Sequence, residues 1–116
     1  MLVIRESLFD VSTTESTVLT IMDSNPWPRV LVLHNRSALS LNLQIQKSVD
    51  GGANWADEGA EFTVGVNGSG TEVAVKTMQG SGVWRLRGSG GNSDSDLEVS
   101  LVEFEVTVST QLPWVK

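Results

Sequence analysis

The sequence predicts a single all-β domain, an antiparallel β-sandwich or jelly roll of about seven or eight strands. Apolar residues alternate with polar ones along most segments, and glycine-rich or proline-rich turns separate these segments. No segment has the apolar spacing of a helix. The chain has 116 residues, of which 40% are hydrophobic, enough for one core but not for two. We therefore treat residues 1–116 as one domain.

The alternation locates the strands in order along the chain. It is clearest at residues 39–46, where Leu41, Leu43 and Ile45 share one face and polar residues occupy the other. The continuous apolar run at 30–33 is typical of a strand that is covered on both faces. At 72–77 the pattern predicts a strand with Val73 and Val75 directed inward. Further strands are expected at 18–21, 62–66 and 83–87.

The last predicted strand changes phase along its length. Residues 97, 99 and 101 are apolar with one parity, and residues 102, 104, 106 and 108 are apolar with the other. A β-bulge or strand break near Leu101 and Val102 would keep both sets on the core side. The sequence therefore predicts a bulge at that position.

Composition excludes several classes of function. The net charge of −6 repels phosphate backbones, so a direct nucleic-acid partner is not expected. The absence of cysteine removes disulfides and thiolate chemistry. Arg5 and Glu6 interrupt the apolar run that a signal peptide needs, and no stretch has the length of a membrane span. We expect an unprocessed protein that is made in the cytoplasm and does not enter membranes.

The sharpest local motif is SVDGGANW at residues 48–55, which fits the pattern SxDxGxxW. Asp50 can accept backbone N–H hydrogen bonds across a hairpin turn, Gly51 and Gly52 can adopt positive φ, and Trp55 can pack beneath the turn. The motif resembles the Asp-box of sialidase-type propellers, where it stabilises turns between strands. We interpret it as a structural turn, and carbohydrate contact at Asn54 or Trp55 is the alternative.

A wider resemblance covers the run from Leu31 to Leu101, with LVLHNRSALSLNLQIQKSVDGGANW, then EVAVKT, GVWRLRGSGG and DLEVSLVEF. This run is similar to small β-sandwich domains of tailed-bacteriophage virion proteins. The positions that carry the resemblance are Asn35, Ser37, Ser48, Asp50, Gly51, Trp55, Trp84, Arg85, Leu86, Ser89, Gly90 and Gly91. It implies a capsid decoration (cement) protein on the outer surface of the virion, which binds the major capsid protein or another virion protein as a homo-oligomer, typically a trimer.

The sequence offers no arranged catalytic group, cofactor site or metal site. His34 is the only histidine and ends an apolar strand, which favours a structural role over a catalytic base. Glu103 and Glu105 share a strand face, where such pairs are usually solvated rather than catalytic. The oxygen-rich loop at 92–98 could approach a calcium ion, but an acidic, mobile surface loop is the favoured interpretation because an EF-hand's ligands are missing.

The candidate interface residues are Leu2, Ile4, Trp27 and Trp114. Trp27 and Trp114 each have a neighbouring proline, whose fixed φ restricts the backbone next to the ring. The apolar residues of segments 1–9 and 110–116 are costly to leave in water. We expect these terminal segments to contact partners; the alternatives are that both ends fold back onto their own domain and that each tryptophan covers an open end of the sandwich. The leading hypothesis is a non-enzymatic capsid decoration protein. The alternatives are a carbohydrate-binding module or receptor-binding β-sandwich that uses exposed tryptophans and, more remotely, a fragment of an Asp-box glycosidase.

Overall fold

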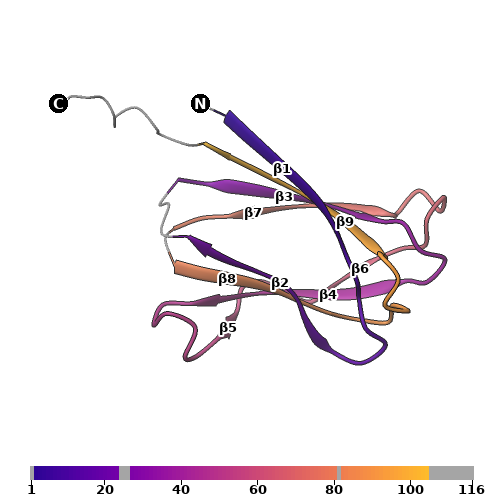
Figure 1. Cartoon of the computed structure of the whole chain (residues 1–116), viewed down its shortest axis with the longest axis horizontal. Helices are drawn as coiled ribbons and strands as arrows, with labels where there is room; N and C mark the ends of the chain where they lie inside the picture. The colour runs from indigo at the N-terminus through magenta and orange to yellow at the C-terminus, as the bar shows by residue number, and fades with distance from the viewer. Residues whose placement is uncertain (1, 24–26, 81, 105–116) are drawn as a thin grey trace.

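The computed structural model describes residues 2–23, 27–80 and 82–104. Within these residues the chain forms nine strands in two sheets, and every strand pairing is antiparallel (Figure 1). The predicted antiparallel β-sandwich is therefore confirmed. The strands are β1 (Leu2–Phe9), β2 (Ser16–Asp23), β3 (Arg29–Asn35), β4 (Leu41–Ser48), β5 (Ala56–Asp57), β6 (Phe62–Val64), β7 (Val73–Met78), β8 (Gly82–Ser89) and β9 (Leu97–Phe104).

The two sheets form two layers (Figure 1). Sheet A has the order β1-β9-β3-β7, and sheet B has the order β2-β8-β4, with both β5 and β6 paired to the remaining edge of β4. Along one side of the sandwich the edge strand β1 lies over the edge strand β2, because both line one groove. Along the other side β7 lies over β6 and the loop that precedes it.

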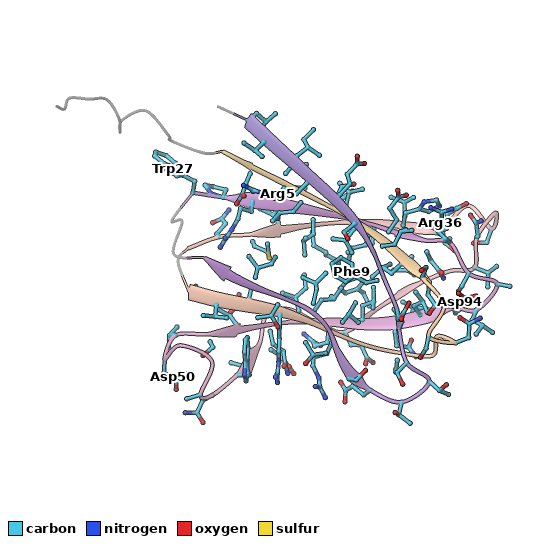
Figure 2. The ribbon with its side chains drawn as sticks, viewed as in Figure 1. Arg5, Phe9, Trp27, Arg36, Asp50 and Asp94 are labelled. Atoms are coloured by element: carbon cyan, nitrogen blue, oxygen red, sulfur yellow. The ribbon has the colours of Figure 1, made fainter. Side chains whose placement is uncertain are left out.

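The core lies between the layers and follows the alternation of the strands. Trp84 and Leu86 of β8 point inward, as do the alternate leucines of β4, while Phe9 at the end of β1 packs against this cluster (Figure 2). The buried apolar residues are Val11, Leu31, Leu33, Leu41, Leu43, Ile45, Val64, Met78, Trp84, Leu86, Leu97 and Val99. Both sheets thus contribute side chains to one continuous core.

The predicted bulge near Leu101 and Val102 is wrong. β9 pairs with β1 and β3 in unbroken register, so Val99 and Leu101 face the core while Val102 faces outward. The irregularity in register lies instead in β2, between Thr17 and Leu19. The change of phase in the sequence therefore marks a strand with apolar residues on both faces.

Two other predictions about which strand faces are buried are also wrong. Val73 and Val75 of β7 point away from the core and are 54% and 61% exposed, because Ala74, Lys76 and Met78 occupy the inner face of that strand. β3 is covered on one face only, since no further layer of the described chain covers the outer side of sheet A. The outer residues of β3 are consequently half-buried rather than buried.

Charged residues fill the interior at one end of sheet A. Arg29 is fully buried and lies opposite Glu103 in the pairing of β3 with β9. Glu103 is 4% exposed and forms an ion pair with Arg5 of β1. The expectation that Glu103 is solvated is therefore wrong, because regular alternation along β9 turns it inward. Glu105 lies outside the described residues.

The N-terminal segment is a strand of this domain. β1 pairs with β9 along its whole length, from Leu2 opposite Phe104 to Phe9 opposite Leu97. It was not among the strands that alternation predicted, and neither was the two-residue β5. The C-terminal segment 110–116 lies outside the described residues. In the part of the chain that the structure describes, no helix has the length and apolarity to cross a membrane.

Candidate functional site: an apolar sheet face and an open cleft

The outer face of sheet A carries apolar residues on all four strands, but Glu6 and Ser100 interrupt them in the row of Val32 and Val75. Pairing registers place Ile4, Val102 and Val30 side by side in one row, and Val32 beside Val75 in the next. Ile4 is 59% exposed, so the face is open to water in the isolated chain. We call this surface the A face: Leu2, Ile4, Leu8, Val30, Val32, Val73, Val75 and Val102.

Polar groups border the A face at one end. His34 Nδ1 lies 3.4 Å from Glu98 Oε1, and both side chains belong to the row that also contains Leu8 and Val73. His34 is about one-third exposed and thus stands on the rim of this surface. An exposed surface rich in apolar residues and bordered by polar groups is typical of an interaction site.

A cleft of about 420 Å³ opens between the edges of β7 and sheet B. Ile45 and Trp84 form its buried part, and Lys76 covers the ring of Phe62 at a distance of 4.2 Å. The loop residues Glu58, Gly59 and Ala60 complete the opposite wall. Trp84 is 2% exposed, and its indole N–H has no hydrogen-bond acceptor among the described residues. We call this the β7 cleft.

The predicted structural turn is a closed network of hydrogen bonds. Ser48 Oγ donates to Asp50 Oδ1 at 2.7 Å, and the Gly52 N–H donates to Ser48 Oγ at 2.8 Å. Asn54 donates to Asp50 through both its backbone N–H at 2.9 Å and its side-chain amide at 2.7 Å. These bonds, with the Ser48 hydroxyl as the largest contributor, lower the pKa of Asp50 to about 2. Gly52 has φ of 99°, which favours glycine.

Trp55 follows this turn and contacts sheet B rather than the core. Its ring lies 4.2 Å from the Arg85 guanidinium carbon, and Arg85 Nε donates to Gln46 Oε1 at 2.7 Å. A pocket of about 210 Å³ next to the ring is lined in part by Asp50 and Asn54. The tryptophan therefore combines a structural contact with a partly exposed surface.

The structure separates the candidate interface residues. Leu2 and Ile4 lie on the A face, whereas Trp27 precedes β3 at one end of the sandwich, where Asp50 also lies (Figure 2). Trp27 is 48% exposed. Trp114 lies outside the described residues. Sequence reasoning missed the other members of the A face, although the apolar residues of both parities in β3 and β9 were the signal.

The loop at 92–98 is organised around a buried carboxylate. Asp96 is 1% exposed and accepts hydrogen bonds from the backbone N–H groups of Val11 at 3.1 Å and Asp94 at 3.2 Å. Asp94 itself is exposed at the opposite end of the molecule from Trp27 (Figure 2). The interpretation as a solvated surface loop is therefore wrong for Asp96. Among the described residues no group of three or more acidic or histidine side chains is placed to hold a metal ion.

Residues that carry the virion-protein resemblance have roles in folding. The Asn35 amide donates to Gly65 O at 2.8 Å, and its Oδ1 accepts from the Ser37 hydroxyl at 2.8 Å, so this pair joins two loops in the interior. Gly90 has φ of 90°, and a Cβ there would lie 2.8 Å from Ser40 O. The close approach of two backbones explains why glycine is needed at this position.

Comparisons with known proteins do not assign this chain to a family. No protein-family model matches the chain, and no curated protein matches it. One solved structure with some similarity is the Yersinia pseudotuberculosis-derived mitogen, at a TM-score of 0.44 and 14% sequence identity. That alignment covers 97% of this chain and 95% of the mitogen chain.

Proposed function

We propose that this chain is a non-enzymatic bacteriophage virion protein, a decoration protein that binds the assembled capsid as a homo-oligomer, with a trimer favoured. The observation that carries the assembly part is the A face, whose apolar residues lie on all four strands of sheet A and include the exposed Leu2, Ile4, Leu8, Val73 and Val75. An exposed face of this kind favours association, because contact with a partner removes the apolar side chains from water. The virion part rests on the sequence resemblance.

The proposed mechanism is stabilisation by mass action. A protein that binds only the assembled shell stabilises it by RT ln(1 + [L]/Kd), where [L] is its free concentration. No catalytic group is needed for this role. The sandwich supplies a rigid support, and the A face and the edge strands of sheet A supply contacts to neighbouring copies and to the major capsid protein.

Carbohydrate binding is the second candidate. It is favoured by the pocket beside Trp55, where an aromatic ring, the Asp50 carboxylate and the Asn54 amide meet. Sugar recognition typically combines such groups. If glycans bind there, Trp55→Ala will abolish glycan retention on an affinity column while shell binding is unchanged.

The decisive experiment is cosedimentation with candidate phage capsids, together with sedimentation velocity of the free protein. Ile4→Lys places a charge on the A face, and Thr20→Lys places the same charge on the exposed outer side of sheet B. We expect Ile4→Lys to weaken both self-association and shell binding by roughly tenfold or more, since burying an unpaired charge is costly. Thr20→Lys should leave both unchanged. Equal behaviour of the two variants would refute the assignment of the interface to the A face.

A further inference from the structure

The edge of β7 is open for pairing with another strand. The Asn35 N–H donates to Glu72 O, so alternation along the antiparallel pair leaves the backbone groups of Val73, Val75 and Thr77 on the side away from β3. β7 pairs with no other described strand. Natural edge strands are usually protected by proline or by outward charges. β7 has neither, because its one charged side chain, Lys76, turns inward over Phe62.

The β7 cleft lies directly inside this open edge. A strand added beside β7 would extend sheet A, and every second side chain of that strand would point toward sheet B. Those side chains would meet Phe62 and the buried ring of Trp84. The Trp84 N–H, which lacks an acceptor among the described residues, would then have polar atoms of the added chain within reach.

We propose that the segment after β9 of a neighbouring copy adds to β7 as an extended strand and fills the β7 cleft. This segment, residues 105–112, reads EVTVSTQL, with Val106 and Val108 alternating with Thr107 and Ser109. Such alternation is typical of a strand with one buried face. The inference rests on the proposed homo-oligomer.

The distance from the end of β9 to the open edge of β7 indicates that the added strand comes from a neighbouring copy and not from the same chain. Sheet A has the order β9-β3-β7, so a strand beyond β7 lies three strand spacings, roughly 14 Å, from β9. Val106 follows Phe104 by two residues, which span at most about 7 Å. Residues 106–109 therefore cannot all lie along the β7 of their own chain, because Val106 does not reach it, but they can lie along that of an adjacent molecule.

The absence of cysteine from the chain makes disulfide cross-linking a clean test. One preparation of the full chain carries Thr77→Cys, and a second, size-tagged preparation carries a single cysteine at Val106, Thr107, Val108 or Ser109. The two are mixed, oxidised and separated on non-reducing gels. The matched control replaces Thr77→Cys by Thr20→Cys, which is exposed on β2, the edge strand of sheet B.

We expect mixed disulfides whose yield alternates with period two along residues 106–109, at roughly ten times the yield of the Thr20→Cys control or more. Dominant Thr77-to-Thr77 disulfides would show that β7 pairs with another β7 and would overturn the proposal. Yields equal to the control would also overturn it. If sedimentation velocity then still shows oligomers, only the strand addition fails. If the protein is monomeric and does not bind capsids, the proposed function fails as well.

Discussion

The outer faces of the two sheets differ in chemistry although both belong to strands of one sandwich. The A face presents valine, leucine and isoleucine in adjacent rows. On the outer face of sheet B, Arg85 donates to Gln46, Gln46 donates to Asp57 at 2.8 Å, and Arg87 donates to Thr17 at 3.2 Å. Sheet B thus satisfies much of its outer face with its own hydrogen bonds. Sheet A has fewer such contacts on its outer face, among them Ser100 to Glu6 and His34 to Glu98, and it exposes more apolar side chains.

This difference shows that period-two alternation distinguishes the inner face of a strand from its outer face only where the outer face is polar. In β8 the inner positions include Trp84 and Leu86, and the outer ones are polar apart from Val83, so the two faces are distinguished within the strand itself. In β3 and β9 apolar residues also occupy outer positions, namely Val30 and Val32 in β3 and Val102 in β9, so the distinction between the faces is weaker. A strand with apolar residues on both faces is expected where both sides are covered, and the described residues of this chain cover only the inner side of β3 and β9.

Among the substitutions considered, the largest loss of stability is expected at Asp96, which joins the two sheets. The Asp96 carboxylate, just before β9 of sheet A, accepts the N–H groups of Val11 and of the loop that follows β8 of sheet B. Asp96→Ala leaves these buried donors without an acceptor and should lower the free energy of unfolding by roughly 3 kcal/mol. Urea denaturation measures this change.

Asp94→Ala in the same loop is the control, because this side chain is exposed. It should change the free energy of unfolding by less than about 0.5 kcal/mol. Equal effects of the two substitutions would mean that Asp96 does not join the sheets, and that the two faces need not behave as parts of one rigid body.

The second-largest effect on stability is expected from a comparison of the inner and outer faces of β9. Val99 is buried on the inner side of β9, and Val102 lies on the A face. Val99→Ala should cost about 2 kcal/mol in the free energy of unfolding, from lost burial and the cavity left behind. Val102→Ala should cost less than half of that, and it should weaken self-association where Val99→Ala does not. Equal costs would indicate a bulge that turns Val102 inward.

Much of the fold could be predicted from the sequence because its strongest signals are local. The alternation at 39–46 contains β4, whose inner leucines are buried, and the turn at 48–55 closes through its own side chains. These features depend on residues that are near one another in the chain. Strand β1 was missed because its inner positions include Arg5 and Ser7, which break the apolar pattern.

The candidate site could not be predicted because it depends on contacts between distant segments. Parity shows that Val73 and Val75 share a face, but only the pairing of β7 with β3 shows that this face points outward. The burial of Glu103 similarly depends on Arg5, which is far from it in the sequence. The β7 cleft arises where the edges of two different sheets meet, a position that no local pattern specifies.

A smaller effect is expected on the outer face of sheet B. Arg85 stacks on Trp55, and contacts of this kind at partly exposed sites contribute about 0.5–1 kcal/mol. A double-mutant cycle with Arg85→Ala and Trp55→Ala should return a coupling energy in this range. Neither substitution should change self-association. A loss of association in these variants would place a partner on sheet B and remove the functional difference between the faces.

The smallest effect concerns the exposed turn that follows β4, and it depends on pH. The Ser48 hydroxyl, and after it Asn54, stabilise the charged form of Asp50 and lower its pKa from the usual 3.8 to about 2. Because the pKa is lower in the folded state, the turn contributes stability that is fully present above the pKa of the unfolded chain and is lost as the pH falls from about 4 to about 2. Solvent screens this exposed group, so the contribution should be small. Asp50→Asn should therefore flatten the pH dependence of the melting temperature in that interval only. Ser48→Ala removes the largest cause and should raise the pKa of Asp50 toward 3.8, as followed by the chemical shift of the carboxyl carbon. If the pKa stays near 2 in Ser48→Ala, the hydroxyl is not what stabilises the carboxylate, and the turn depends on Asn54 instead.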